Sequence, residues 1–285
     1  MNIDFVETKT STRHMMEKHF PRAMMNFRIL KKTGFEREMA FLPELCDPDK
    51  ISLDIGANIG MFTWHPRRHS LATMAFEPNP YLSDLLRCTL GDSVPVRQAA
   101  LSNRCGTVRL NFPNDWHALG SLVDTEDHQY LEEKYDRVTS FDVKTLRLND
   151  LDFPPIGFVK INVEGHDLEV LEGAQRTIRT HHPKLLIEIE ERHRPGAVKR
   201  VIELLTKWGY AGSVLIQGNL SAVSEFRLAT HQNPLNLDDR GNRIWRWAFK
   251  RQLHWISYCL SVDNAISSTI WKKNCFHGSK HRSYQ

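Results

Sequence analysis

The chain has 285 residues, of which 41% are hydrophobic and 25% are charged, and its formal net charge is +4. These proportions are typical of a soluble globular protein and exclude a disordered chain or a bundle of membrane helices. No stretch approaches the roughly 18 apolar residues that a transmembrane helix needs. The five cysteines are far apart and form no CxxC pair, which favours reduced thiols and a cytoplasmic location.

Short apolar runs alternate along the chain with segments that can form helices. Five of these runs have strand length: ISLDI (51–55), LATMAF (71–76), VPVRQAAL (94–101), IGFVKINV (156–163) and KLLIEIE (184–190). Helices are predicted after Gly165 and at 197–208 by apolar residues at helical spacing. Segments 106–112 and 137–143 are predicted as extra strands. The alternation predicts an α/β fold with a mostly parallel sheet and helices on both faces.

The composition changes near residue 242. The last part of the chain is rich in Lys, Arg and Trp and contains one acid, Asp263. We therefore predict an N-terminal extension (1–34), a main domain (35–242) and a basic, Trp-rich tail (243–285). Apolar residues of the tail fall on one helical face: Trp245, Phe249, Ile256 and Leu260. They favour either a weak contact with a membrane surface or partner, or a segment that covers the core.

A turn of small residues follows the first apolar run, in LDIGANIGMF. The dinucleotide-binding fingerprint requires glycines at 56, 58 and 61, but this chain has Gly56, Asn58 and Met61, so a pyrophosphate ligand is disfavoured. The strand-end carboxylate of Asp54 would repel phosphate but attract a cation. S-adenosylmethionine carries an ammonium group, and glycines such as Gly56 and Gly60 let backbone lie against its methionine part. The turn therefore favours this cofactor.

A second acid follows the second apolar run, in AFEPNP. Glu77 lies 77 − 54 = 23 residues after Asp54, close to the spacing of about 20 residues in a nucleoside-binding βαβ unit. Its carboxylate can accept hydrogen bonds from both ribose hydroxyls. Taken singly, such features are more often a tight turn and a surface acid. Their order and spacing together favour a nucleoside site.

Several motifs resemble the FkbM family of S-adenosylmethionine-dependent methyltransferases: DIGANIGMFTW, AFEPNP, AALSNRCGTVRL, GSL and FVKINVEGHDLEVLEGA. The resemblance runs from about Phe35 to about Asn236. It implies a Rossmann-like class I methyltransferase fold with a mostly parallel, seven-stranded sheet. It also implies methylation of a hydroxyl oxygen on a sugar, polyketide or other small molecule, with S-adenosyl-L-methionine as methyl donor.

The resemblance also implies a set of cofactor-binding residues. Asp54, Gly56, Asn58 and Gly60 would line the methionine part, Glu77 would hold the ribose, Ala100, Leu101 and Ser102 would flank the adenine, and Asn162 would lie near the methyl group. The family usually has KIDVEG where this chain has KINVEG, so Asn162 replaces an acid. The alternative function is therefore a methyltransferase-fold protein that binds the cofactor without turnover.

Transfer to a hydroxyl requires a base that removes its proton. His166 is the first candidate, because an imidazole with a pKa of about 6.5 suits this task at neutral pH; Glu164 and Glu190 are the second and third. The alternative for His166 is that it only caps the helix it begins.

Other ligand and partner classes are disfavoured. Glu188, Glu190 and His193 could be drawn as metal ligands, but we expect no metal there. The main domain shows no nucleic-acid signature, so the predicted partner is a small-molecule or glycan acceptor. A nicotinamide-dependent oxidoreductase would need glycines at 58 and 61, and this chain lacks both.

Overall fold

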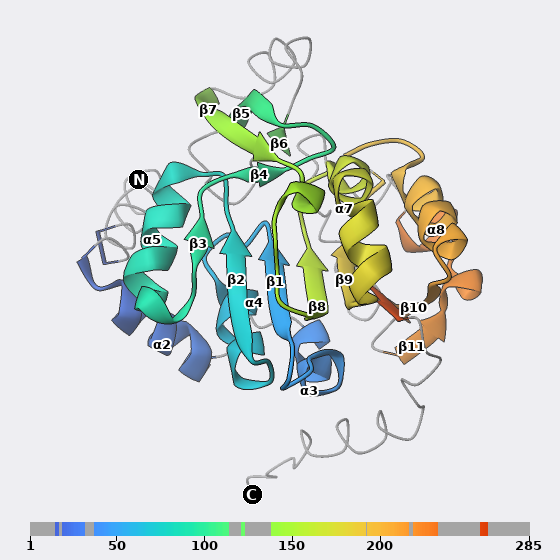
Figure 1. The fold of residues 1–285 in the computed structure, drawn as a ribbon, viewed down its shortest axis with the longest axis horizontal. Helices are drawn as coiled ribbons and strands as arrows, with labels where there is room; N and C mark the ends of the chain where they lie inside the picture. Colours follow the sequence, from blue (N-terminus) through green and yellow to red (C-terminus); the bar gives the residue numbers. More distant parts are fainter. Residues whose placement is uncertain are drawn as a thin grey trace, which may run out of the picture.

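The computed structural model describes residues 15–16, 19–31, 37–113, 121–122, 138–191, 193–216, 219–232 and 257–261. They form a central sheet with helices packed around it and a second, smaller sheet beyond one edge of it (Figure 1). The central strands are β1 (Ile51–Ile55), β2 (Ala72–Phe76), β3 (Val96–Arg97), β8 (Ile156–Ile161), β9 (Lys184–Glu188), β10 (Ala211–Ile216), β11 (Asn219–Ala222) and β12 (Ser257–Ser261). The second sheet contains β4 (Ala100–Leu101), β5 (Gly106–Pro113), β6 (Ser121–Leu122) and β7 (Val138–Leu146).

The α-helices are α2 (Pro21–Lys31), α3 (Leu42–Leu45), α4 (Met61–Trp64), α5 (Pro80–Leu90), α7 (Asp167–His181), α8 (Ala197–Lys207) and α9 (Leu228–His231). Short 3-10 helices are η1 (Arg37–Phe41), η2 (Pro66–Arg68), η3 (Gly91–Ser93), η4 (Leu148–Asp150) and η5 (Val223–Glu225). The two helices expected after Gly165 and at 197–208 are confirmed as α7 and α8. None of the helices in the described ranges combines the length and apolar character that a membrane span requires.

The central sheet has the order β11-β10-β12-β9-β8-β1-β2-β3. Neighbours from β9 to β3 pair in parallel, whereas β12 runs antiparallel to both β9 and β10. The expected Rossmann-like, mostly parallel α/β class is thus confirmed. Within the described residues the sheet has eight strands rather than seven, because a hairpin adds β11 at the edge beside β10.

The predominantly apolar sequences of β1 and β8 are explained by the position of these strands at the centre of the sheet. Every residue of both strands is buried, as expected for parallel strands covered on two faces. The register sets Asp54 of β1 beside Ala75 of β2 on one side and Lys160 of β8 on the other. Two charged side chains therefore meet inside an otherwise apolar layer.

The run at 94–101 forms two strands rather than the single one expected. β3 pairs with β2 in the central sheet and ends at Arg97, whereas β4 pairs with β7 in the second sheet. The amide of Ala99 donates to the carbonyl of Arg97, and this turn separates the two. The extra strands expected at 106–112 and 137–143 are confirmed as β5 and β7.

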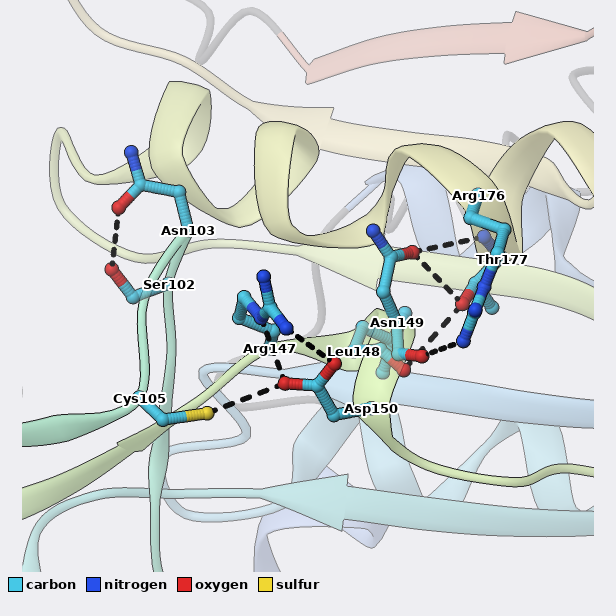
Figure 2. Close-up of polar contacts among 9 residues, drawn as sticks. All are labelled: Ser102, Asn103, Cys105, Arg147, Leu148, Asn149, Asp150, Arg176 and Thr177. Carbon is cyan, nitrogen blue, oxygen red and sulfur yellow. Dashed lines mark hydrogen bonds and ion pairs between the residues drawn. The ribbon is translucent and has the colours of Figure 1, made fainter.

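The second sheet is joined to α7 by contacts around η4 (Figure 2). Asn149 Oδ1 accepts hydrogen bonds from the amide and hydroxyl of Thr177, at 3.0 and 3.2 Å. Arg147 forms a two-point contact with Asp150, at 2.7 and 2.8 Å. Nearby, a Cβ placed on Gly173 would lie 1.9 Å from the carbonyl oxygen of Ser102. Helix α7 therefore touches the turn that follows β4.

The predicted tail contributes one strand to the central sheet. β12 pairs with β9 and β10, so residues 257–261 of the predicted tail lie in the central sheet. Composition reports the charge of a segment and not its strand pairing. Leu260 consequently lies in a strand rather than in the predicted amphipathic helix. The rest of the tail, and residues 1–14, 17–18 and 32–34 of the N-terminal extension, lie outside the described residues.

Candidate functional site

Most of the predicted site residues lie at one edge of the central sheet. The arrows of β1, β2, β8 and β9 end at this edge, and the second sheet lies beyond it (Figure 1). Ligands of doubly wound sheets bind at the carboxyl ends of the strands. The edge has two halves, one at the ends of β1 and β2 and the other at the ends of β8 and β9.

Asp54 is buried and already has two polar partners. Thr63 Oγ1 donates to its Oδ2 at 2.6 Å, and Lys160 Nζ lies 3.2 Å from its Oδ1, with the two side chains only 7% and 2% exposed. The same ammonium donates to the carbonyl oxygen of Gly56 at 2.8 Å. The Asp54 carboxylate is therefore neutralised inside the protein, and Lys160 connects it to the turn.

The turn after β1 depends on left-handed backbone. Gly56, Asn58 and Gly60 have φ angles of 75°, 51° and 85°, a region that disfavours side chains with a Cβ. A Cβ placed on Gly56 would lie 1.8 Å from the carbonyl oxygen of Asn162. Glycine is thus required at position 56 because the turn presses against the end of β8. The first helix after the turn, α4, is a single turn long and gives way to η2 at Pro66.

Glu77 faces this turn from the end of β2. Its Oε2 accepts a hydrogen bond from the backbone amide of Asn58 at 2.7 Å, and its Oε1 accepts one from the backbone amide of Asn79 at 2.9 Å. Burial raises the pKa of Glu77 to about 7, although both amide contacts and the charge of Lys160 lower it. Asn79 also caps α5 through Oδ1. The carboxylate is therefore fixed by backbone groups on two sides.

The residues expected to flank the adenine lie at the end of β4. Ala100, Leu101 and Ser102 are all buried, and the amide of Ser102 donates to the carbonyl of Leu146. Ser102 Oγ lies 3.0 Å from His166 Nε2. The turn after β4 is thereby connected to the start of α7.

His166 lies beside this adenine-side turn. It occupies the N-cap position of α7, but its side chain makes no capping hydrogen bond. Its Nδ1 is 3.6 Å from Glu169 Oε2, and Glu169 also contacts Arg194. Burial, reinforced by Arg194, lowers the pKa of His166, against the opposing charge of Glu169. Both ring nitrogens of His166 therefore already face polar partners.

Glu164 and Glu190 come together around a histidine at the β8–β9 half. His193 Nε2 lies 2.8 Å from Glu164 Oε2 and 3.9 Å from Glu190 Oε2. The 2.8 Å contact is an ion-pair distance, but its angle is not that of a regular hydrogen bond. All three side chains are about one-fifth exposed. This half of the edge is therefore open to solvent, unlike the half around Asp54.

Asn162 extends the same half. Its Nδ2 donates to Glu188 Oε2 at 2.5 Å, so the amide connects the ends of β8 and β9. Within the described residues, no group of three or more His, Cys, Asp or Glu side chains has an arrangement that could hold a metal ion.

Sequence reasoning missed two residues of this edge as functional candidates. Lys160 could have been identified from the sequence, because a charged residue inside an apolar run indicates a buried polar partner. The sequence pattern indicates His193 only as a possible metal ligand, although this residue closely follows Glu190 in the chain. Its contact with Glu164 depends on the packing of one loop against another, which no local motif encodes.

Comparisons with known proteins identify relatives of this chain. A family model described as the methyltransferase FkbM domain matches residues 54–211. A methyltransferase, sdnD, from Sordaria araneosa is 27% identical over 54% of this chain and 70% of its own length. The hexuronic acid methyltransferase AglP from Haloferax volcanii is 28% identical over 62% of this chain and 71% of its own length.

A solved structure of an FkbM methyltransferase from Methylobacillus flagellatus is also similar. It is 18% identical, with a TM-score of 0.42, over 59% of this chain and 40% of that chain. This chain thus spans less than half of the solved one.

Proposed function

This chain belongs to the FkbM methyltransferase family, and we propose that it transfers the methyl group of S-adenosylmethionine to a hydroxyl oxygen of a sugar, polyketide or other small molecule. Family membership supports the reaction class. The proposals of this cofactor and of an oxygen acceptor are based on the residues at the carboxyl ends of the strands.

The observation that carries the proposal is the setting of Glu77. Each of its oxygens already accepts one backbone amide. A carboxylate oxygen has two acceptor positions, so each keeps one for a ribose hydroxyl. Because Glu77 is held by Asn58 and Asn79, it needs no rearrangement to receive a diol, and this preorganisation favours binding.

The turn after β1 fits the methionine part of the cofactor. Gly56, Asn58 and Gly60 would hold it against backbone, and glycine at position 56 lets this turn pack against the end of β8, because a Cβ there would lie 1.8 Å from the carbonyl oxygen of Asn162. Asp54 would act through Lys160, which fixes the carbonyl of Gly56. Ala100, Leu101 and Ser102 would flank the adenine. Asn162, at the end of β8, would lie toward the methyl group.

The bound cofactor supplies a methyl group on a sulfonium centre. The residues of this chain must bring the acceptor oxygen in line with that methyl and remove the hydroxyl proton. His166, Glu164 and Glu190 are the candidates for that proton transfer. A uronic acid sugar is the first acceptor to test, because one relative is named for a hexuronic acid.

A second candidate function is cofactor binding without turnover. It is favoured by Asn162, which stands where the family usually has an acid and which donates to Glu188. Loss of a required carboxylate would leave the binding half of the site intact. Both candidates predict cofactor binding, and only the first predicts a methylated product.

Calorimetric titration with S-adenosylmethionine and S-adenosylhomocysteine tests the cofactor proposal. We expect micromolar binding by the wild type, loss of binding in Glu77→Ala, and unchanged binding in Asp84→Ala, which removes an exposed acid from α5. No binding by folded wild-type protein would overturn the proposal. Detection of S-adenosylhomocysteine with a panel of sugar and polyketide alcohols then separates the two candidates.

A further inference from the structure

We propose that His193 is the base that accepts the hydroxyl proton of the acceptor, and that Glu164 and Glu190 are the residues that position it. The inference rests on the proposed function, because it assigns the proton transfer of that reaction. Of these three residues, Glu164 follows β8 in the chain, whereas Glu190 and His193 follow β9. They meet at the edge of the sheet where the acceptor must reach the methyl group.

The backbone around this cluster is strained in a way that brings His193 to Glu164. Glu164 has a φ of 50° and Gly165 a φ of 93°. A Cβ on Gly165 would lie 2.7 Å from the Cβ of His193, so only glycine lets the two loops pack together. A non-glycine residue in left-handed backbone is strained, and such strain clusters at functional sites. The amide of His193 also donates to the carbonyl of Glu190 at 3.2 Å.

The contact with Glu164 favours one tautomer of the His193 ring. With its proton on Nε2, facing Glu164 Oε2 at 2.8 Å, a neutral imidazole has its lone pair on Nδ1. No described residue forms a hydrogen bond with that nitrogen. Catalytic contacts are often poorly aligned before substrate binds, so the imperfect angle at Nε2 is compatible with the role. We assign this tautomer from the contacts of the ring.

Three acidic side chains lie near His193. Glu164 and Glu190 face its ring. Asp167, at the start of α7, is also near: burial raises the pKa of its carboxyl to about 7, although the charge of His193 lowers it. Carboxylates beside an imidazole stabilise the imidazolium that forms when it takes a proton.

His166 is less suited to this step. Its Nε2 faces Ser102 and its Nδ1 faces Glu169, so accepting a substrate proton would disrupt an existing contact. Its surroundings also lower its pKa, which disfavours the protonated product. His193 has one nitrogen engaged and the other without a described partner.

The proposed step transfers one methyl group and one proton. The acceptor oxygen forms a bond to the methyl carbon while its O–H bond breaks, and the proton passes to Nδ1 of His193. The electron pair of the broken carbon–sulfur bond stays on sulfur, which loses its positive charge. The imidazolium then gives the proton to solvent. Glu164 and Glu190 keep their protonation states throughout.

The kinetic test compares His193→Gln with His69→Gln, which changes a histidine near the opposite edge of the sheet, before β2. We expect His193→Gln to lower kcat about 100-fold or more, with KM and S-adenosylhomocysteine affinity within about twofold of wild type, and His69→Gln to retain wild-type turnover. Imidazole added to His193→Ala should restore part of the rate, and a purely structural role predicts no such rescue. Thermal unfolding of each variant confirms that it is folded.

A second readout needs no turnover. Nitrogen-15 NMR of the histidine rings in the full chain should show one resonance set that disappears in His193→Gln and that has the Nε2–H tautomer in wild type. In Glu164→Gln this set should change to a mixture of tautomers, because the acceptor at Nε2 is weakened. An unchanged tautomer in that variant would contradict the positioning role of Glu164.

The outcomes separate this inference from the proposed function. Wild-type turnover with full activity in His193→Gln, and activity lost in His166→Gln instead, would overturn the inference while the methyltransferase proposal stands. Cofactor binding without turnover on any acceptor would overturn both.

Discussion

The two halves of the sheet edge are built differently. At the ends of β1 and β2, the carboxylates of Asp54 and Glu77 are almost fully buried and are held by backbone amides or by Lys160. At the ends of β8 and β9, Glu164, Glu190 and His193 are about one-fifth exposed and contact one another through side chains.

The difference matches the tasks proposed for the two halves. A half that always binds the same cofactor gains from fixed, buried groups, because fewer degrees of freedom are lost on binding. A half that must receive an acceptor and exchange protons with water needs solvent access. Substitutions in the first half should therefore affect stability and cofactor binding together, whereas those in the second half should affect turnover more than stability.

The largest expected effect is from Gly56→Ala in the buried half. Its Cβ would lie 1.8 Å from the Asn162 carbonyl in left-handed backbone. Backbone strain of about 2 kcal/mol and overpacking of about 3 kcal/mol together predict a loss of about 5 kcal/mol. The matched control is Gly209→Ala, where φ is 88° but no atom lies within 4 Å, so only the strain remains. Urea denaturation measures the stability of both variants. Equal losses in Gly56→Ala and Gly209→Ala would contradict the close approach of Gly56 to the Asn162 carbonyl.

Lys160→Met should lower the free energy of unfolding by nearly as much. It leaves the Asp54 carboxylate buried without its cation, and breaking a buried pair costs about 3–5 kcal/mol. The double variant Asp54→Asn, Lys160→Met should be more stable than Lys160→Met alone, because no uncompensated charge remains. Lys199→Met, which removes an exposed pair with Glu203, should change nothing measurable. A double variant no more stable than Lys160→Met would show that the pair is not what stabilises this half.

Glu77 gives the buried half a distinct pH dependence. Because its pKa rises from 4.5 to about 7 on folding, the folded protein binds more protons than the unfolded chain between these values. Stability should therefore fall as pH rises from about 4.5 to 7, by about 3 kcal/mol for this group. Asp167, raised to about 7 as well, adds a similar fall.

Denaturation across this pH range measures the effect. Glu77→Gln should remove one part of the slope and Asp167→Asn the other, even if either substitution also shifts the curve as a whole. A Glu77→Gln slope identical to that of wild type would mean that Glu77 does not titrate in this range.

The smallest expected effect is at the open half. Asn162→Asp places a second carboxylate against Glu188 Oε2, where the amide now donates, and should cost about 1–2 kcal/mol at pH 7. The loss should shrink below pH 5, as one carboxylate takes up a proton. Asn103→Asp, beside Glu172 at an exposed site, is the control and should cost less. If Asn162→Asp also creates turnover that wild type lacks, binding without turnover is the native function.

The contiguous features were predictable from sequence. β1, β2, β8 and α7 follow from runs and periodicity, and the turn and Glu77 follow from local motifs. The partner of Asp54 could not be predicted from a local motif, because Lys160 meets Asp54 only through the register of β1 and β8. The insertion of β12 between β9 and β10 likewise depends on long-range pairing. Predictions succeeded where a segment of about ten residues contained the information, and failed where two distant segments had to meet.

The hydrogen bond from Lys160 to the carbonyl of Gly56 spans 104 positions of the chain. During synthesis, the glycine turn leaves the ribosome long before Lys160 does. Lys160 cannot fix the turn until β8 has emerged and packed against β1, since both segments must be present for this contact. The nascent protein should therefore not bind the proposed cofactor until most of its central sheet has formed, and binding would indicate a folded domain rather than a folded turn.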